Sequence, residues 1–145
     1  MAVTPNSIIT PQAPRLGLQN FSTVDAAGTY KNVLQGGSNG TKITGIYASS
    51  GDTGLAHLMT FQVQRSGTNF GGVAVSVPAN AGFANGIPPV NLISTANWPG
   101  LPTDSDGNPF LFLQSTLDIL VATYATGIST GISATLNAAA VGGDF

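Results

Sequence analysis

Residues 127–131 read Gly-Ile-Ser-Thr-Gly, the spacing at which hydrolases place a nucleophilic serine on a tight turn. That motif requires a strand, a turn and a helix, followed along the chain by an acid and then a histidine. Downstream of Ser129 the only acid is Asp144, and His57 lies far upstream. The residues that follow alternate as in a strand, so the sequence predicts a β-turn here and no catalytic residues.

Residues 104–108 read Asp-Ser-Asp-Gly-Asn and resemble a calcium-binding loop. An EF-hand loop has its glycine at position six and a bidentate glutamate at position twelve. Counted from Asp104, the glycine here is fourth and position twelve is Ser115. Short Asp and Asn side chains also hydrogen-bond local backbone in turns. We expect a structural turn, with a hard cation bound by Asp104 and Asp106 as the alternative.

The single histidine and the single tryptophan are also residue types that could form a functional site. His57 has no cysteine, glutamate or second histidine with which to complete a metal site, so we expect no metal centre. We expect His57 to be a hydrogen-bonded edge residue at the start of a strand. Trp98 is expected to plug one end of the core, and the alternative is a carbohydrate platform or a partner contact.

The composition argues against catalysis. Only 7% of the residues are charged, against about 25% in an average globular domain, and glutamate and cysteine are absent. Because acid–base catalysis needs placed titratable groups, we expect neither an enzyme nor a cofactor. The four basic residues form no patch, which argues against nucleic-acid binding. A surface with so little charge favours association with other subunits.

The sequence contains no predicted membrane-spanning segment. The longest apolar run covers residues 119–125, far below the ~20 residues that span a bilayer. The first residues lack a basic segment followed by an apolar stretch, so we expect no secretory signal.

Residues 1–20 are predicted to form an extended arm, and residues 21–145 a single domain. Pro5, Pro11 and Pro14 each fix φ and favour extended backbone in the preceding residue. Ile8 and Ile9 lie between them and would anchor the arm on a neighbouring subunit. The alternative is a frayed terminus.

The rest of the chain reads as short strands separated by turns. Alternating or β-branched runs predict strands over residues 30–35, 41–49, 55–65, 70–77, 110–114, 117–124 and 132–140. Asn39-Gly40 predicts a hairpin because both residues tolerate positive φ. Six prolines between residues 78 and 109 exclude a central strand there, and Pro88-Pro89 predicts a short helix over residues 90–97. The predicted fold is therefore an all-β antiparallel β-sandwich, of the jelly-roll type, with an immunoglobulin-like sandwich as the alternative.

Three segments resemble small virion proteins of tailed bacteriophages. They are residues 4–12 (TPNSIITPQ), residues 101–109 (LPTDSDGNP) leading into 110–113, and residues 143–145. The chain is similar to the capsid decoration, or cement, proteins of these viruses. The resemblance implies a dimeric or trimeric subunit on the outer capsid surface, assembled in the host cytoplasm, that bridges major capsid protein subunits.

No catalytic residue follows from this resemblance. We expect the partner-binding residues to be Ile8, Ile9, Pro11 and Pro14 of the arm, together with Trp98. The alternative function is a fibre or receptor-binding module that recognises glycan. It predicts Trp98 or Tyr47 exposed beside Asp and Asn side chains.

Overall fold

The computed structural model describes residues 13–125, 127–128 and 135–145. These residues form strands and turns but no helix, and therefore none that could cross a membrane. The strands are β1 (Ala13–Phe21), β2 (Lys31–Gln35), β3 (Thr41–Ser50), β4 (His57–Arg65), β5 (Thr68–Val77), β6 (Val90–Asn91), β7 (Leu111–Leu113), β8 (Asp118–Tyr124) and β9 (Leu136–Asp144).

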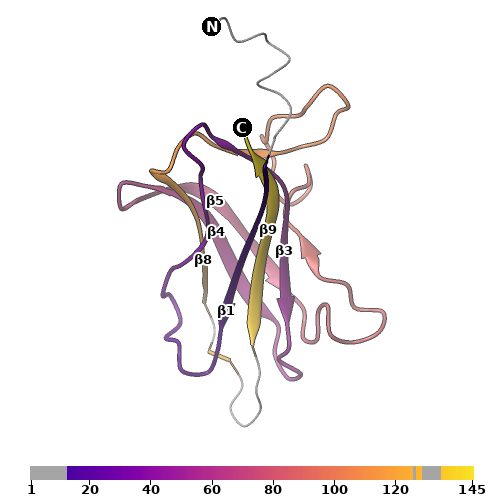
Figure 1. The fold of residues 1–145 in the computed structure, drawn as a ribbon. Helices are drawn as coiled ribbons and strands as arrows, with labels where there is room; N and C mark the ends of the chain where they lie inside the picture. Colours follow the sequence, from indigo (N-terminus) through magenta and orange to yellow (C-terminus); the bar gives the residue numbers. More distant parts are fainter. Residues whose placement is uncertain (1–12, 126, 129–134) are drawn as a thin grey trace, which may run out of the picture.

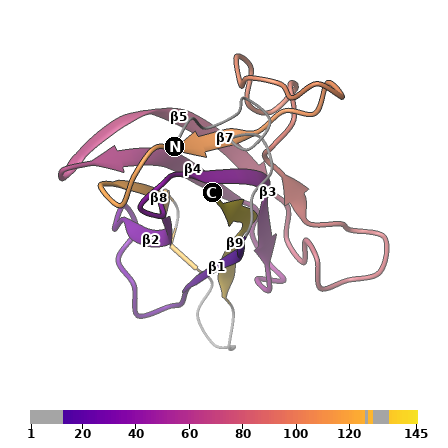
Figure 2. The ribbon, with the colours of Figure 1, turned by 45° about the horizontal axis from the view of Figure 1, so that its top comes forward.

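The strands form two antiparallel sheets that face each other (Figures 1 and 2). Sheet A has the order β1-β9-β3-β6, and β7 also pairs with β3. Sheet B has the order β2-β8-β4-β5. The predicted all-β antiparallel sandwich is confirmed, and each predicted strand has a counterpart in the structure.

The core lies between the sheets and is built by simple alternation. In β4, His57, Met59 and Phe61 are fully buried, whereas the residues between them point to the other side of sheet B. Tyr124 of β8 packs edge-on against Phe21 of β1, with ring centroids 5.3 Å apart. A strand places successive side chains on opposite faces, so the period of two in the sequence produces one apolar layer per sheet.

The sandwich is closed along the side where β1 meets β2. A Cβ on Gly17 would lie 2.2 Å from the carbonyl oxygen of Val33, so only glycine allows this approach. Arg15 donates hydrogen bonds to Asp144 (2.6 Å) and to the carbonyl oxygen of Gln35 (2.8 Å). The edge strands of the two sheets are therefore tied together here.

The boundary predicted for the arm is wrong. Residues 13–20 belong to β1, which pairs along its whole length with β9. Their extended conformation was predicted correctly, but it is satisfied within the sandwich. Because β1 is an edge strand, the missing N–H of Pro14 is tolerated. Ile8, Ile9 and Pro11 lie outside the described residues.

The helix predicted over residues 90–97 is also wrong. Val90 and Asn91 pair with β3 as strand β6, and the N–H of Leu92 donates to the carbonyl oxygen of Ile46. One helical turn follows, in which the N–H of Trp98 donates to the carbonyl oxygen of Ser94 (2.8 Å). Backbone groups that a helix would use at its start are bonded to β3 instead.

The hairpin predicted at Asn39-Gly40 is wrong in its pairing. Gly40 has a φ of 100°, as a tight turn requires, but β2 belongs to sheet B and β3 to sheet A. The turn therefore carries the chain between sheets. A two-residue hairpin does occur at Ser66-Gly67, where φ is 50° and 81° between the paired strands β4 and β5.

Candidate functional site

The outer face of sheet A exposes apolar side chains at regular intervals. In β1, Gly17 and Phe21 are buried, whereas Leu16, Leu18 and Asn20 occupy the alternate positions and are exposed on the other face. Leu16 and Leu18 are 63% and 67% exposed. Large aliphatic side chains exposed at alternating positions of one strand form a row, and a contiguous exposed apolar patch is a candidate interaction site.

The row continues across the neighbouring strands. Leu16 lies opposite Val141 of β9, and Leu18 lies opposite Ala139, which in turn lies opposite Tyr47 of β3. The side chains of Tyr47 and Val141 both pack over Gly45. A Cβ at Gly45 would lie 2.8 Å from each of them. We call these five residues the apolar face: Leu16, Leu18, Tyr47, Ala139 and Val141.

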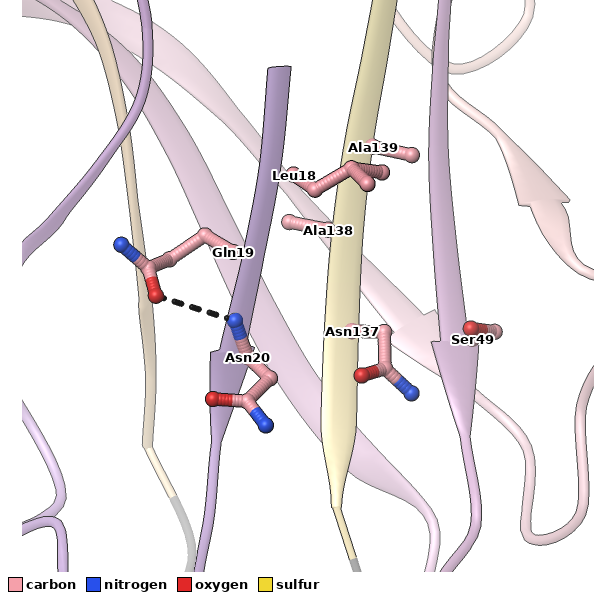
Figure 3. A pocket seen from close by; sticks show the side chains of 7 residues that line it. All are labelled: Leu18, Gln19, Asn20, Ser49, Asn137, Ala138 and Ala139. Carbon is pink, nitrogen blue, oxygen red and sulfur yellow. Dashed lines mark hydrogen bonds between the residues drawn. The ribbon is translucent and has the colours of Figure 1, made fainter. Parts of the chain in front are cut away.

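One end of the apolar face is a polar trough. Figure 3 shows Asn20, Asn137 and Ser49 below Leu18 and Ala139, on the neighbouring strands β1, β9 and β3. The register aligns Asn20 with Asn137 and Asn137 with Ser49. The side chains in this trough are uncharged, so the trough offers hydrogen-bonding groups and no net charge.

The opposite end of the same face is a pocket of about 330 Å³. This pocket lies on the same outer face as Pro14. Pro14 pairs with Gly143, Gly143 pairs with Lys42, and Lys42 also pairs with Phe112 of β7. The ring centroids of Phe112 and Phe145 lie 5.8 Å apart. We call this the aromatic pocket, lined by Lys42, Thr103, Asp104, Ser105, Phe110, Phe112 and Phe145.

The charge at the aromatic pocket is neutralised. The Nζ atom of Lys42 lies 3.3 Å from Asp104 Oδ2 and 4.9 Å from the centroid of the Phe110 ring. The hydrogen bond from the backbone N–H of Asn108 lowers the pKa of Asp104, and the hydrogen bond from Lys42 lowers it further. The lining is therefore apolar, with one internal ion pair at its rim.

Every lysine and arginine of the chain has an acidic partner. The remaining pairs are Arg15–Asp144, Lys31–Asp25 and Arg65–Asp118, at 2.5–2.8 Å. The hydrogen bonds from Arg65 lower the pKa of Asp118, which is 3% exposed. Each basic charge is thus paired locally, and with a net charge of only −2 the surface has little long-range attraction for a charged ligand.

The Asp104 loop is a structural turn, as predicted. Asp104 Oδ1 accepts hydrogen bonds from the N–H groups of Asp106 (3.0 Å) and Asn108 (2.9 Å). Its other oxygen is bonded to Lys42. Among the described residues, no three His, Cys, Asp or Glu side chains gather as metal ligands would.

Sequence reasoning missed a buried pair between His57 and Asp52. Both side chains are fully buried, and His57 Nε2 lies 2.8 Å from Asp52 Oδ2. Asp52 Oδ1 accepts hydrogen bonds from the N–H groups of Gly54 (2.8 Å) and Leu55 (3.2 Å). With no access for a substrate, the pair holds the turn that leads from β3 to β4. An aspartate five residues before the predicted strand histidine was the available signal.

The predicted contact residues separate into different environments. Pro14 is exposed and adjoins the apolar face. Trp98 is half-buried and packs against the core, and its predicted contact with a partner stays a prediction. His57 is hydrogen-bonded at the start of β4, as expected, but it is fully buried in a strand that lies between β8 and β5, so the expected edge position is wrong. Of the serine motif, residues 129–131 lie outside the described residues.

Comparison with known proteins gives no assignment for this surface. The chain matches no family model and no curated protein.

Proposed function

We propose that this chain is a structural virion protein that binds the outer surface of a phage capsid and bridges major capsid protein subunits. The observation that carries the proposal is the apolar face, an uncharged interaction surface that adjoins Pro14. The resemblance of residues 4–12 and 101–109 to capsid decoration proteins supports the capsid as partner. In this proposal the arm residues Ile8, Ile9, Pro11 and Pro14 contact a neighbouring subunit.

The strand order supports a jelly roll as the specific fold. Strands β6 and β7 both pair with β3, so they act as one interrupted edge strand. Two four-stranded sheets of order β1-β9-β3-β6/β7 and β2-β8-β4-β5 then have the connectivity of a double Greek key. Jelly rolls occur in viral capsid proteins and in lectins, so this fold fits the proposal without selecting it.

The surface chemistry explains why association would suffice for function. Exposed aliphatic side chains gain from leaving water by roughly 25 cal/mol per Å² of apolar area. A shell offers many copies of its binding site, and modest contacts repeated over those copies stabilise it by multivalency. We propose a dimer or trimer as the binding unit, because two or three apolar faces engage the shell together.

The experiment is co-sedimentation of the purified protein with capsids that lack it. We expect saturable binding in fixed ratio to capsid protein and a raised capsid melting temperature. Leu18→Asp places a charge on the apolar face and is expected to abolish binding. Leu58→Asp is the matched control, because Leu58 is 45% exposed on the outer face of sheet B.

Both variants should fold, since both leucines are exposed. Equal loss of binding in the two variants, or unchanged binding in Leu18→Asp, would contradict the assignment of the apolar face. No binding by the wild-type protein would contradict the capsid proposal itself.

A glycan-binding module is the second candidate, and the surroundings of Tyr47 favour it. Tyr47 is 39% exposed, and its register partner Asn91 and the nearby trough residues supply amide groups. Exposed aromatic rings beside amides are suited to sugar rings. Shifts of the Tyr47 ring resonances on titration with host surface polysaccharide would favour this function over capsid binding.

A further inference from the structure

The aromatic pocket is a concave apolar site that the proposed function does not use. Its walls are the rings of Phe110, Phe112 and Phe145, and its volume of about 330 Å³ accommodates one or two aliphatic side chains. Phe112 is 39% exposed, although a ring of this size gains from burial. The Lys42–Asp104 pair at the rim is already neutral, so the pocket selects an uncharged, apolar occupant.

The chain that precedes β1 starts beside this pocket. Ala13 lies opposite Asp144, and Phe145 is the next residue. Strands are about 4.8 Å apart, so β7 with Phe112 lies roughly 14 Å from β1, three strands away. Four extended residues span up to ~14 Å, which brings Ile9 within reach of the rings.

Residues 1–12 contain the type of side chain that the pocket lacks. Ile8 and Ile9 are adjacent aliphatic residues between Pro5 and Pro11, in a segment with no charged side chain. Neutral, branched aliphatic groups match a neutral pocket of aromatic rings. Because the segment is tethered next to the pocket, its effective concentration there is in the millimolar range or above, which favours the same chain over a second copy.

We propose that the Ile8-Ile9 segment docks in the aromatic pocket of its own chain. The contact covers the three phenylalanine rings and holds the arm over the ends of β9 and β3. The docking rests on the pocket and the tether, and it holds whether or not the capsid is the partner.

The test is methyl NMR of the full-length protein with labelled isoleucine, without any capsid. Methyl signals of Ile8 and Ile9 are assigned with the variants Ile8→Leu and Ile9→Leu. We expect at least one of them to be shifted upfield from its random-coil position by ring currents, with NOEs to phenylalanine ring protons. Tenfold dilution should leave these shifts unchanged, since the contact is within one chain.

Two substitutions locate the contact. Phe145→Ala should return the shifted methyl signal to its random-coil position. Phe83→Ala is the matched control and should leave the signal in place, because Phe83 is 61% exposed and does not line the pocket.

Random-coil positions for both isoleucines in the wild-type protein would overturn the proposal. So would shifts that disappear on dilution, since these would assign the contact to a second copy. Capsid co-sedimentation is a separate measurement, so its failure would leave this result standing.

Discussion

The two outer faces of the sandwich follow the same alternation but carry different side chains. On sheet A, β1 sends Leu16 and Leu18 outward, and the neighbouring strands add aliphatic and aromatic groups. On sheet B, β4 sends Leu58, Thr60, Gln62 and Gln64 outward. Neither of these two rows contains a charged residue, so charge does not distinguish them.

The polar face of sheet B satisfies part of its own hydrogen bonding. Gln64 Nε2 donates to Asn69 Oδ1 (2.9 Å), which links β4 to β5. Within this row Gln62 Oε1 is buried without a hydrogen-bond partner. The amide and hydroxyl groups that reach water gain little from contact with another protein. The comparison teaches that a candidate docking face of a nearly uncharged protein is found from the types of its outward residues, since the alternation is the same on both sheets.

The largest expected effect comes from displacing β1, which carries two leucines of the apolar face. Gly17→Ala places a Cβ 2.2 Å from the Val33 carbonyl oxygen, and backbone cannot move aside cheaply. We expect a loss of about 2 kcal/mol in unfolding free energy, together with weaker capsid binding. Urea denaturation measures the first effect and co-sedimentation the second.

Gly71→Ala in β5 of sheet B is the control for that substitution. No atom lies within 4 Å of a Cβ at Gly71, so stability should be unchanged or slightly higher. If Gly17→Ala proves as stable as Gly71→Ala, then β1 and β2 do not approach as described.

The next effect concerns the ion pairs that border the two sheets. Asp118, at the start of β8, accepts hydrogen bonds from Arg65 Nε (2.5 Å), Arg65 Nη2 (2.6 Å) and the N–H of Gln114 (2.8 Å). Asp118→Asn should cost about 1.5 kcal/mol at neutral pH, the lower end of the range for hydrogen bonds to charged groups, because asparagine keeps one acceptor oxygen. Asp104→Asn, beside the aromatic pocket, should cost less, because its side chain is 18% exposed against 4% for Asp118.

The same pair predicts a pH dependence with a definite sign. The hydrogen bonds from Arg65 hold the pKa of Asp118 below its value in the unfolded chain, about 3.9. The stabilisation is therefore complete above about pH 4 and is lost as pH falls through the lowered pKa. Urea midpoints measured from about pH 7 to about pH 2 should fall less steeply in Asp118→Asn. Equal slopes in the variant and the wild type would count against this linkage.

The smallest effect distinguishes two exposed tyrosines. Tyr47→Ala removes the ring at the centre of the apolar face and should weaken capsid binding about tenfold, as expected for an aromatic contact residue. Tyr30→Ala removes a ring of similar exposure, 42% against 39%, outside that face. Binding titrations of the two variants should differ, and identical affinities would show that the apolar face is not the contact surface.

Much of the fold could be predicted from the sequence because strand alternation is a local property. The alternation of Met59 and Phe61 with Thr60 and Gln62 predicts which side of β4 is buried, and the structure confirms it. The turn at Asp104 was also predictable, since its hydrogen bonds reach only two and four residues along the chain. Both cases depend on neighbours in sequence.

The candidate site was harder to predict because its parts are distant in sequence. Leu18, Tyr47 and Ala139 meet only through the β1–β9 and β9–β3 registers. The aromatic pocket likewise joins Lys42 to Phe110 and Phe145. Of the predicted contact residues within the described part of the chain, Pro14 adjoins this surface and Trp98 packs on the core.

The sequence by itself determined that this chain forms short strands with one buried side each and little charge. Only the tertiary structure decided which strands share a sheet. Gly40 allows a tight turn whether or not the flanking strands pair with each other, and here β2 and β3 belong to different sheets. Val90 and Asn91 became a strand because β3 offered them free hydrogen-bonding groups. Pairing partners are chosen by long-range packing of the two apolar layers, and local residue preferences do not encode that choice.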